Sequence, residues 1–88
     1  MASEQPSVLL VEDEPAQREV LAYNLEADGF AVTRAENGEE ALMLVDEAAP
    51  DILLRVRVLP NVSGIAVSRP LASRASTRGV PIILISAR

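Results

Sequence analysis

Apolar residues along the chain follow two patterns, short uninterrupted runs and stretches in which they recur every three or four positions. An uninterrupted run is typical of a strand buried on both faces, whereas the second pattern is typical of a helix with one buried side. The patterns alternate in the order β-α-β-α-β-α-β, which indicates a parallel sheet with right-handed crossovers. The predicted strands are residues 8–11, 30–34, 52–58 and 80–85, and the predicted helices are residues 15–28, 38–49 and 63–74.

Each predicted helix has its own start and stop signals. Pro15 suits the first turn of the first helix, where a backbone N–H has no partner, and Gly29 suits a left-handed C-cap. Asn37 is a favourable N-cap for the second helix, with Glu40 at the capping-box position, and Pro50 ends that helix. The predicted buried residues are Ala16, Val20, Leu21, Tyr23, Leu25 and Ala27 in the first helix and Ala41, Leu44, Val45 and Ala48 in the second.

The third helix is the least regular of the three. Ser63 is a possible cap, but Pro70 falls inside the segment and removes one backbone hydrogen bond. We therefore expect a kink or an early end at Pro70.

Three consecutive acids, Glu12, Asp13 and Glu14, follow the first strand directly. In open α/β sheets ligands bind beyond the carboxyl ends of the strands, and carboxylates there can hold a hard divalent cation such as Mg²⁺. The alternative interpretation is a solvated loop whose last acid is favoured by the helix dipole. The same loop has no glycine to let a phosphate approach the backbone, which argues against a nucleotide or flavin site.

Composition narrows the class of protein. The 88 residues suffice for one domain, and the chain contains neither cysteine nor histidine, which excludes disulfides, thiolate zinc sites and a histidine base. We find no apolar run long enough to span a membrane and no signal peptide, and so expect a cytoplasmic protein.

Charge is divided unevenly along the chain. All thirteen acids lie at or before Asp51, and the six arginines after it have no acid among them, so the two parts carry charges of −11 and +6. The division indicates either an acidic partner for the basic part or attraction between the two parts, and we favour attraction because the arginines are scattered. We find no recognition-helix motif or basic aromatic stripe and expect no nucleic-acid binding by this chain.

Five segments agree in order and spacing with a known family: VLLVEDEP, DGFAVTRAENGEEAL, APDILL, LPNVSG and VPIILISAR. Together they resemble the receiver domain of two-component response regulators, in particular the winged-helix transcriptional regulators of the phosphate-regulon (PhoB-like) type. The resemblance implies a flavodoxin-like α/β fold with strand order 2-1-3-4 here. It also implies a partial receiver domain over residues 1–88, without the fifth strand, its lysine or the DNA-binding domain.

The resemblance assigns roles to particular positions. In the family, two acids after the first strand help to bind Mg²⁺, and these correspond to Glu12 and Asp13. A hydroxyl after the fourth strand, which contacts the phosphoryl group, corresponds to Ser86. The phosphoacceptor aspartate, which takes a phosphoryl group from a histidine kinase or phosphotransfer protein, corresponds to Val56, and neither Arg55 nor Arg57 can replace it.

Three interpretations of this departure remain open. In the first, the chain is a fragment of a transcriptional regulator and is inactive in phosphotransfer. In the second, it is a natural pseudo-receiver that works by binding partners. In the third, it is an active receiver with another acceptor such as Asp13. We favour the first and predict no enzymatic activity. Mg²⁺ binding should be weak or absent, with Arg55 or Arg57 neutralising the acids instead. The charge-free fourth strand should promote self-association as a dimer, a domain swap or an aggregate.

Overall fold

A computed structural model describes residues 4–57 and 69–86, except that the side chains of Arg57 and Ser86 lie outside the described part. Strands and helices alternate in the predicted order. The elements are β1 (Ser7–Val11), α1 (Pro15–Ala27), β2 (Ala31–Ala35), α2 (Gly38–Glu47), β3 (Ile52–Arg57), α3 (Arg69–Thr77) and β4 (Ile82–Ser86).

The four strands form one parallel sheet in the order β2-β1-β3-β4, which confirms the predicted topology. Val11, the last residue of β1, lies opposite Ala35 at the end of β2 and opposite Arg55 near the end of β3. The loops that follow β1 and β2 therefore meet at one edge of the sheet, beside the end of β3.

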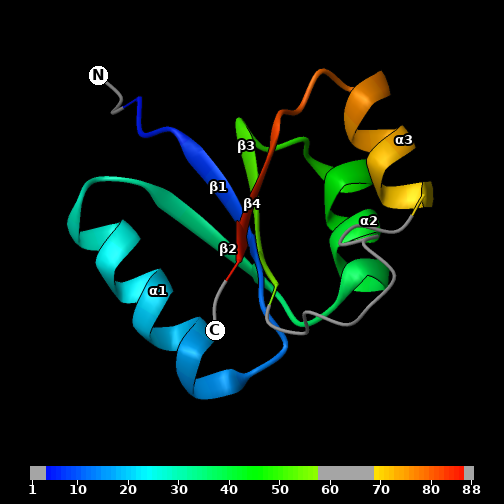
Figure 1. Cartoon of the computed structure of the whole chain (residues 1–88). Helices are drawn as coiled ribbons and strands as arrows, with labels where there is room; N and C mark the ends of the chain where they lie inside the picture. Colours follow the sequence, from blue (N-terminus) through cyan, green and yellow to red (C-terminus); the bar gives the residue numbers. More distant parts are fainter. Residues whose placement is uncertain (1–3, 58–68, 87–88) are drawn as a thin grey trace.

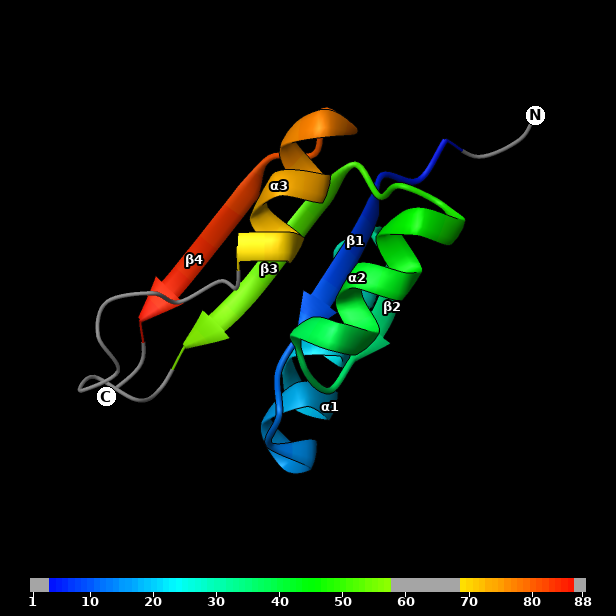
Figure 2. The ribbon, with the colours of Figure 1, turned by 90° about the vertical axis from the view of Figure 1, so that its right-hand side faces the viewer.

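Helices cover the sheet unequally on its two faces. Figures 1 and 2 show α2 and α3 together on one face and α1 alone on the other. The larger core cluster joins Leu9 and Leu53 of the sheet to α2 and α3. Among the described residues, the cluster on the α1 face has three buried members, Leu10, Ala22 and Val56, with Leu21, Val32 and Leu54 half-buried around them. Because α1 packs mainly on β1 and β2, the same face of β4 has little cover.

The capping residues that the sequence indicates are in place. Pro15 is the first residue of α1, and the helix is followed by Gly29, whose φ of 99° lies in the left-handed region that favours glycine. At the start of α2, the N–H of Glu40 donates to Asn37 Oδ1 at 2.8 Å. The Glu40 carboxylate accepts from the N–H of Glu36, one residue before the N-cap that a capping box would use.

The predicted buried side of α1 is wrong. Ala22 is the buried residue of this helix, whereas Val20 is 58% exposed and Tyr23 is 71% exposed. Leu21 and Leu25 are half-buried, and Ala16 and Ala27 are exposed. A single helix lying on two strands buries a narrow strip, so the wider apolar stripe of α1 extends beyond its contact with the sheet.

Two smaller expectations also fail. Ala48 is exposed, because α2 ends at Glu47 and Ala48 is its C-cap. The early helix end predicted at Pro70 is wrong, because α3 continues to Thr77. The predicted kink stays untested, because the turn that precedes Pro70 lies outside the described residues. The cap predicted at Ser63 lies outside the described residues.

Candidate functional site

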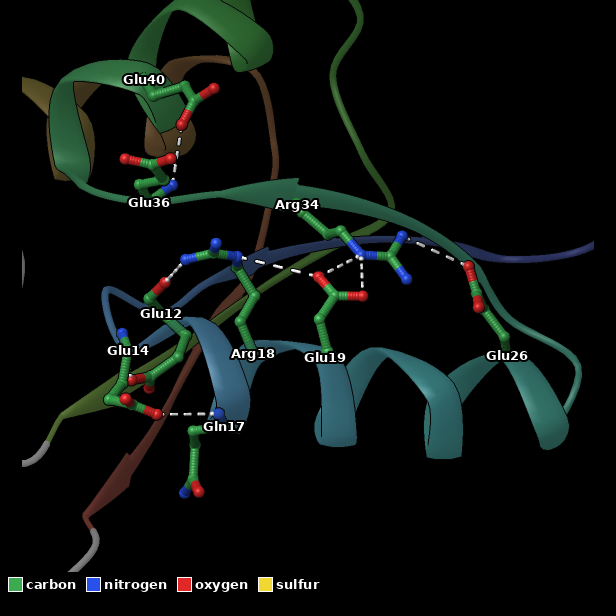
Figure 3. A network of polar contacts seen from close by, with 9 residues as sticks. All are labelled: Glu12, Glu14, Gln17, Arg18, Glu19, Glu26, Arg34, Glu36 and Glu40. Carbon is green, nitrogen blue, oxygen red and sulfur yellow. Dashed lines mark hydrogen bonds and ion pairs between the residues drawn. The ribbon is translucent and has the colours of Figure 1, made fainter.

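The loop between β1 and α1 is fixed by hydrogen bonds on both sides of its first acid. The N–H of Glu12 donates to the carbonyl oxygen of Ala35 at 3.0 Å, which continues the sheet one residue past β1. Arg18 Nη1 donates to the carbonyl oxygen of Glu12 at 2.8 Å, and the N–H of Glu14 donates to Glu12 Oε2 at 2.9 Å. Figure 3 shows Arg18 reaching from α1 to this loop.

Glu12 is the buried charged residue of the described core, with only 1% of its surface exposed. One of its carboxylate oxygens, Oε2, is used by the loop itself. The other, Oε1, is buried and has no hydrogen-bond partner among the described residues. Asp13 is exposed, so the two neighbouring acids differ in their surroundings.

The acids border a small cavity of about 70 Å³ at the carboxyl edge of the sheet. Three loops or strand ends meet around it, as the parallel register requires. Its lining residues are Val11, Glu12, Asp13, Glu36, Asn37, Arg55 and Val56. The structure thus brings Glu12, Asp13 and Val56 together, as the sequence predicts.

Two residues of this cavity were not anticipated. Glu36 and Asn37 belong to the loop after β2, and the sequence pattern indicated Asn37 only as a helix cap. The signal that could have found them is the parallel topology, because the loop after β2 must end at the same edge as the loop after β1.

Val56 is buried, at 4% exposure, and belongs to the cluster that contains Leu10 and Ala22. Its neighbour Arg55 is half-buried and lies on the opposite face of β3, which Leu53 shares. Both residues nevertheless line the cavity, because they stand near the end of the strand.

Comparison with known proteins identifies the family. The sequence profile of the response regulator receiver domain matches residues 8–88, which is most of the chain. The chain belongs to the receiver domain family.

Two relatives show the range of proteins that resemble this receiver domain. The phosphate regulon transcriptional regulatory protein PhoB of Rhizobium meliloti (strain 1021) is 45% identical over 83 residues, which are 94% of this chain and 37% of that protein. Protein PilH of Pseudomonas aeruginosa is 32% identical over 81 residues, 92% of this chain and 67% of PilH. The chain therefore spans little more than a third of its PhoB relative.

A solved structure supports the same assignment. The response regulator TrrA of Thermotoga maritima, in complex with Mg²⁺-BeF, is 31% identical and superposes with a TM-score of 0.74. The match covers 96% of this chain and 71% of TrrA. The receiver domain thus has the fold of a response regulator over nearly its whole length.

The cavity of this receiver domain provides an incomplete set of ligands for a divalent cation. Mg²⁺ prefers octahedral oxygen ligands, and Glu12 and Asp13 supply carboxylates here. Val56 stands where the resemblance places the third carboxylate, and Arg55 brings a positive charge to the same cavity. No group of three acidic, histidine or cysteine side chains suited to a metal ion occurs among the described residues. The residues therefore do not fit the family's metal site.

Ser86 is the last residue of β4 and pairs with Arg57 in the register of the sheet. Its backbone therefore lies at the same edge as the cavity. The role of its hydroxyl group stays a prediction, because the side chain lies outside the described residues.

Charged side chains join elements within the receiver domain. Arg34 of β2 forms ion pairs with Glu19 and Glu26 of α1, at 3.0 and 3.5 Å, and its hydrogen bond to Glu19 is the main cause that raises its pKa (Figure 3). Arg74 of α3 pairs with Asp46 of α2, and this hydrogen bond lowers the pKa of the Asp46 carboxyl group. The second pair joins the basic and acidic parts of the chain, as we favoured from the sequence.

Membrane insertion through a helix has no support in the described part of the chain, where none of the helices is long and apolar enough to cross a bilayer.

Proposed function

We propose that this chain is a response regulator receiver domain that does not accept a phosphoryl group at the family's acceptor position. Val56 carries the proposal. Aspartyl phosphorylation needs an anionic oxygen nucleophile, and nearby positive charge must neutralise the transferred group. A valine side chain has no oxygen atom and cannot form the covalent bond.

The packing of Val56 supports the same conclusion. Its side chain is buried beside Leu10 and Ala22, where an ionised carboxylate would lose much of its hydration. The apolar side chain is therefore part of the small core on the α1 face.

A Mg²⁺ ion bound at this edge would supply charge neutralisation in phosphoryl transfer. Glu12 and Asp13 would hold it, but Glu12 already accepts a hydrogen bond from the loop through Oε2. Because the third carboxylate is replaced by Val56, we propose that any Mg²⁺ binding by this chain is weak.

The experiment compares the wild-type chain with Val56→Asp. Both are incubated with acetyl phosphate and Mg²⁺, and intact mass is measured before and after hydroxylamine, which cleaves acyl phosphates. We expect no added phosphoryl mass on the wild type. Val56→Asp, if its circular dichroism shows a folded chain, should gain one phosphoryl group that hydroxylamine removes.

A phosphoryl group on any residue of the wild type contradicts the proposal. Tandem mass spectrometry of the peptides from the phosphorylated chain then identifies whether Asp13 is the acceptor, because it locates the added mass on one residue. The measurement thus separates an inactive receiver from one with a different acceptor.

The relatives support a regulatory role for the longer protein. PhoB of Rhizobium meliloti is named as a transcriptional regulatory protein, and the present chain matches 37% of its length. We propose that a parent protein of this type is a transcriptional regulator, with a histidine kinase or phosphotransfer protein as the family's partner. DNA binding would then belong to a part of the parent other than this chain.

A second role, as an interaction module, is favoured by the open edge of the sheet. β4 is the last strand of the sheet and carries no charged residue, and Leu84 is 52% exposed. Ile83 and Ile85 on its other face are also exposed. Such an edge offers backbone hydrogen bonds and apolar side chains together, so we propose that a second copy of this chain pairs with β4.

Light scattering over a range of concentrations tests this pairing. Leu84→Lys should keep the chain monomeric at concentrations where the wild type associates, because a charge on an edge strand opposes pairing. Met43→Lys is the matched control, since Met43 is exposed to a similar extent, 59% against 52% for Leu84, but lies on α2. A wild type that stays monomeric throughout, or equal effects of both variants, contradicts pairing through β4.

A further inference from the structure

The cavity at the carboxyl edge of the sheet concentrates negative charge. Glu12, Asp13 and Glu36 reach it from two different loops, and the cavity measures only about 70 Å³. Carboxylates held this close repel one another unless a cation stands between or beside them.

Arg55 brings a positive charge to this cavity from the sheet itself. It lies opposite Val11 in the strand register, one residue before the first of the acids. Arg55 is half-buried and lines the cavity together with Glu12, Asp13 and Glu36. A guanidinium group remains protonated throughout the accessible pH range.

A fixed arginine and a dissolved ion differ in one important respect. The arginine is part of β3 and is present at the site at every magnesium concentration, whereas a free ion must lose water and bind from solution. A resident positive charge also repels a second cation from the same small space.

We infer that Arg55 is the permanent counter-ion of the Glu12–Asp13–Glu36 cavity and takes the place of a divalent cation there. The cavity is then balanced without metal, and its affinity for Mg²⁺ is set by Arg55 as well as by the missing carboxylate. The inference concerns the same site as the proposed function, but it needs no phosphoryl donor and is tested by cation binding alone.

The buried oxygen Glu12 Oε1 makes this assignment informative. It has no hydrogen-bond partner among the described residues, and Glu12 is one of the residues that line the cavity. Removing the arginine charge should therefore raise the affinity of the cavity for a cation, although its acids do not form a complete metal site.

The test compares Arg55→Gln with the wild type by calorimetric titration with MgCl₂. We expect Arg55→Gln to bind Mg²⁺ about tenfold more tightly than the wild type, because one nearby positive charge is removed. Arg69→Gln is the matched control, since Arg69 is exposed on α3 and is not among the lining residues. Its affinity should equal that of the wild type.

The position of the bound cation is checked by repeating the titration with Mn²⁺ in place of Mg²⁺ and recording amide NMR signals. Paramagnetic broadening in Arg55→Gln should be strongest at the amides of Glu12, Asp13 and Glu36. Broadening at other amides overturns the inference, and so does an Mg²⁺ affinity of Arg55→Gln equal to that of the wild type. Wild-type binding of Mg²⁺ tighter than about 1 mM also overturns it, because the dissolved ion would then already compete with Arg55.

Arg55→Lys keeps the experiment decisive if the glutamine variant does not fold. Lysine preserves the charge but not the fork of donors, so a folded lysine variant with weak Mg²⁺ binding supports a counter-ion role. Failure of the lysine variant to fold shows that the arginine is required for packing, and the inference is then wrong.

Discussion

Leu53 and Leu54 are neighbours on β3 whose side chains face opposite sides of the sheet. Leu53 is fully buried in the cluster beneath α2 and α3, whereas Leu54 is half-buried on the face that α1 covers only in part. Truncating each to alanine removes the same atoms from the same strand. The pair therefore measures how unequally the two faces stabilise the fold.

The expected costs follow from burial. Leu53→Ala leaves a cavity in a closed core and should reduce the free energy of unfolding by about 2–5 kcal/mol. Leu54→Ala removes side-chain surface that is already in part hydrated, and we expect a loss of about 1–1.5 kcal/mol. A domain of this size has a total stability of about 4–13 kcal/mol, so the first variant is close to the limit of folding.

Urea unfolding followed by circular dichroism measures both losses at micromolar protein, where association through β4 is least. Repeating the Leu54→Ala measurement at higher concentration adds a second readout. If a second copy covers this side of the sheet, the cost of that substitution should increase with concentration. A cost for Leu54→Ala equal to or greater than that for Leu53→Ala at low concentration refutes the unequal cover inferred for the two faces.

Three further predictions concern individual contacts. Asn37→Ala should lower the free energy of unfolding by about 1 kcal/mol in urea titrations, because α2 loses its N-cap, whereas Asn37→Ser should retain most of it. The pKa of Asp46 is lowered in the folded state, so its ion pair with Arg74 stabilises the fold above the unfolded carboxyl pKa, and this contribution is lost as the pH falls through the folded value. Arg74→Gln should therefore make stability fall less steeply in acid, and an unchanged acid limb of the stability profile argues against the pair. Arg18→Ala should accelerate hydrogen exchange at the amide of Glu14 without a comparable change in α2, because the loop that this amide stabilises loses its anchor.

Strand order was predictable because the family resemblance implies it, and the cavity follows from that order in a parallel sheet. Once the runs at 8–11 and 52–58 are taken as neighbouring buried strands, the acids after the first must lie near the end of the other. That juxtaposition brought Glu12, Asp13 and Val56 to one cavity without any knowledge of side-chain positions. The register of β1 with β3 then placed Arg55 beside them.

The buried side of α1 was not predictable from its own periodicity. Val20 and Tyr23 recur at helical spacing and are apolar or aromatic, but burial depends on what lies opposite them. α1 rests on β1 and β2, and Ala22 is the residue that enters this contact. A pattern along one segment indicates which side of a helix is apolar, whereas only the tertiary structure determines how much of that side is covered.

The early helix end predicted at Pro70 was wrong for a related reason. The effect of this residue depends on its position relative to the first turn, and the sequence placed Pro70 several residues into a helix that was expected to begin at Ser63. The described part of α3 continues past Pro70 to Thr77, so the proline does not end the helix. The effect of a proline depends on where the helix begins, and periodicity does not define that boundary.

By the two proposals above, Arg55 and Val56 both reduce the ability of the acid cavity to hold a ligand, although by different means. Under the proposed function, Val56 lacks the oxygen that would carry a phosphoryl group. Under the further inference, Arg55 adds a charge that competes with a divalent cation. A ligand shifts a conformational equilibrium only through its different affinities for the two states. If neither a phosphoryl group nor a tightly bound cation reaches this cavity, neither can bias the domain from this site. The two proposals together therefore predict that two adjacent residues of β3 turn a receiver's switching site into a fixed part of the fold.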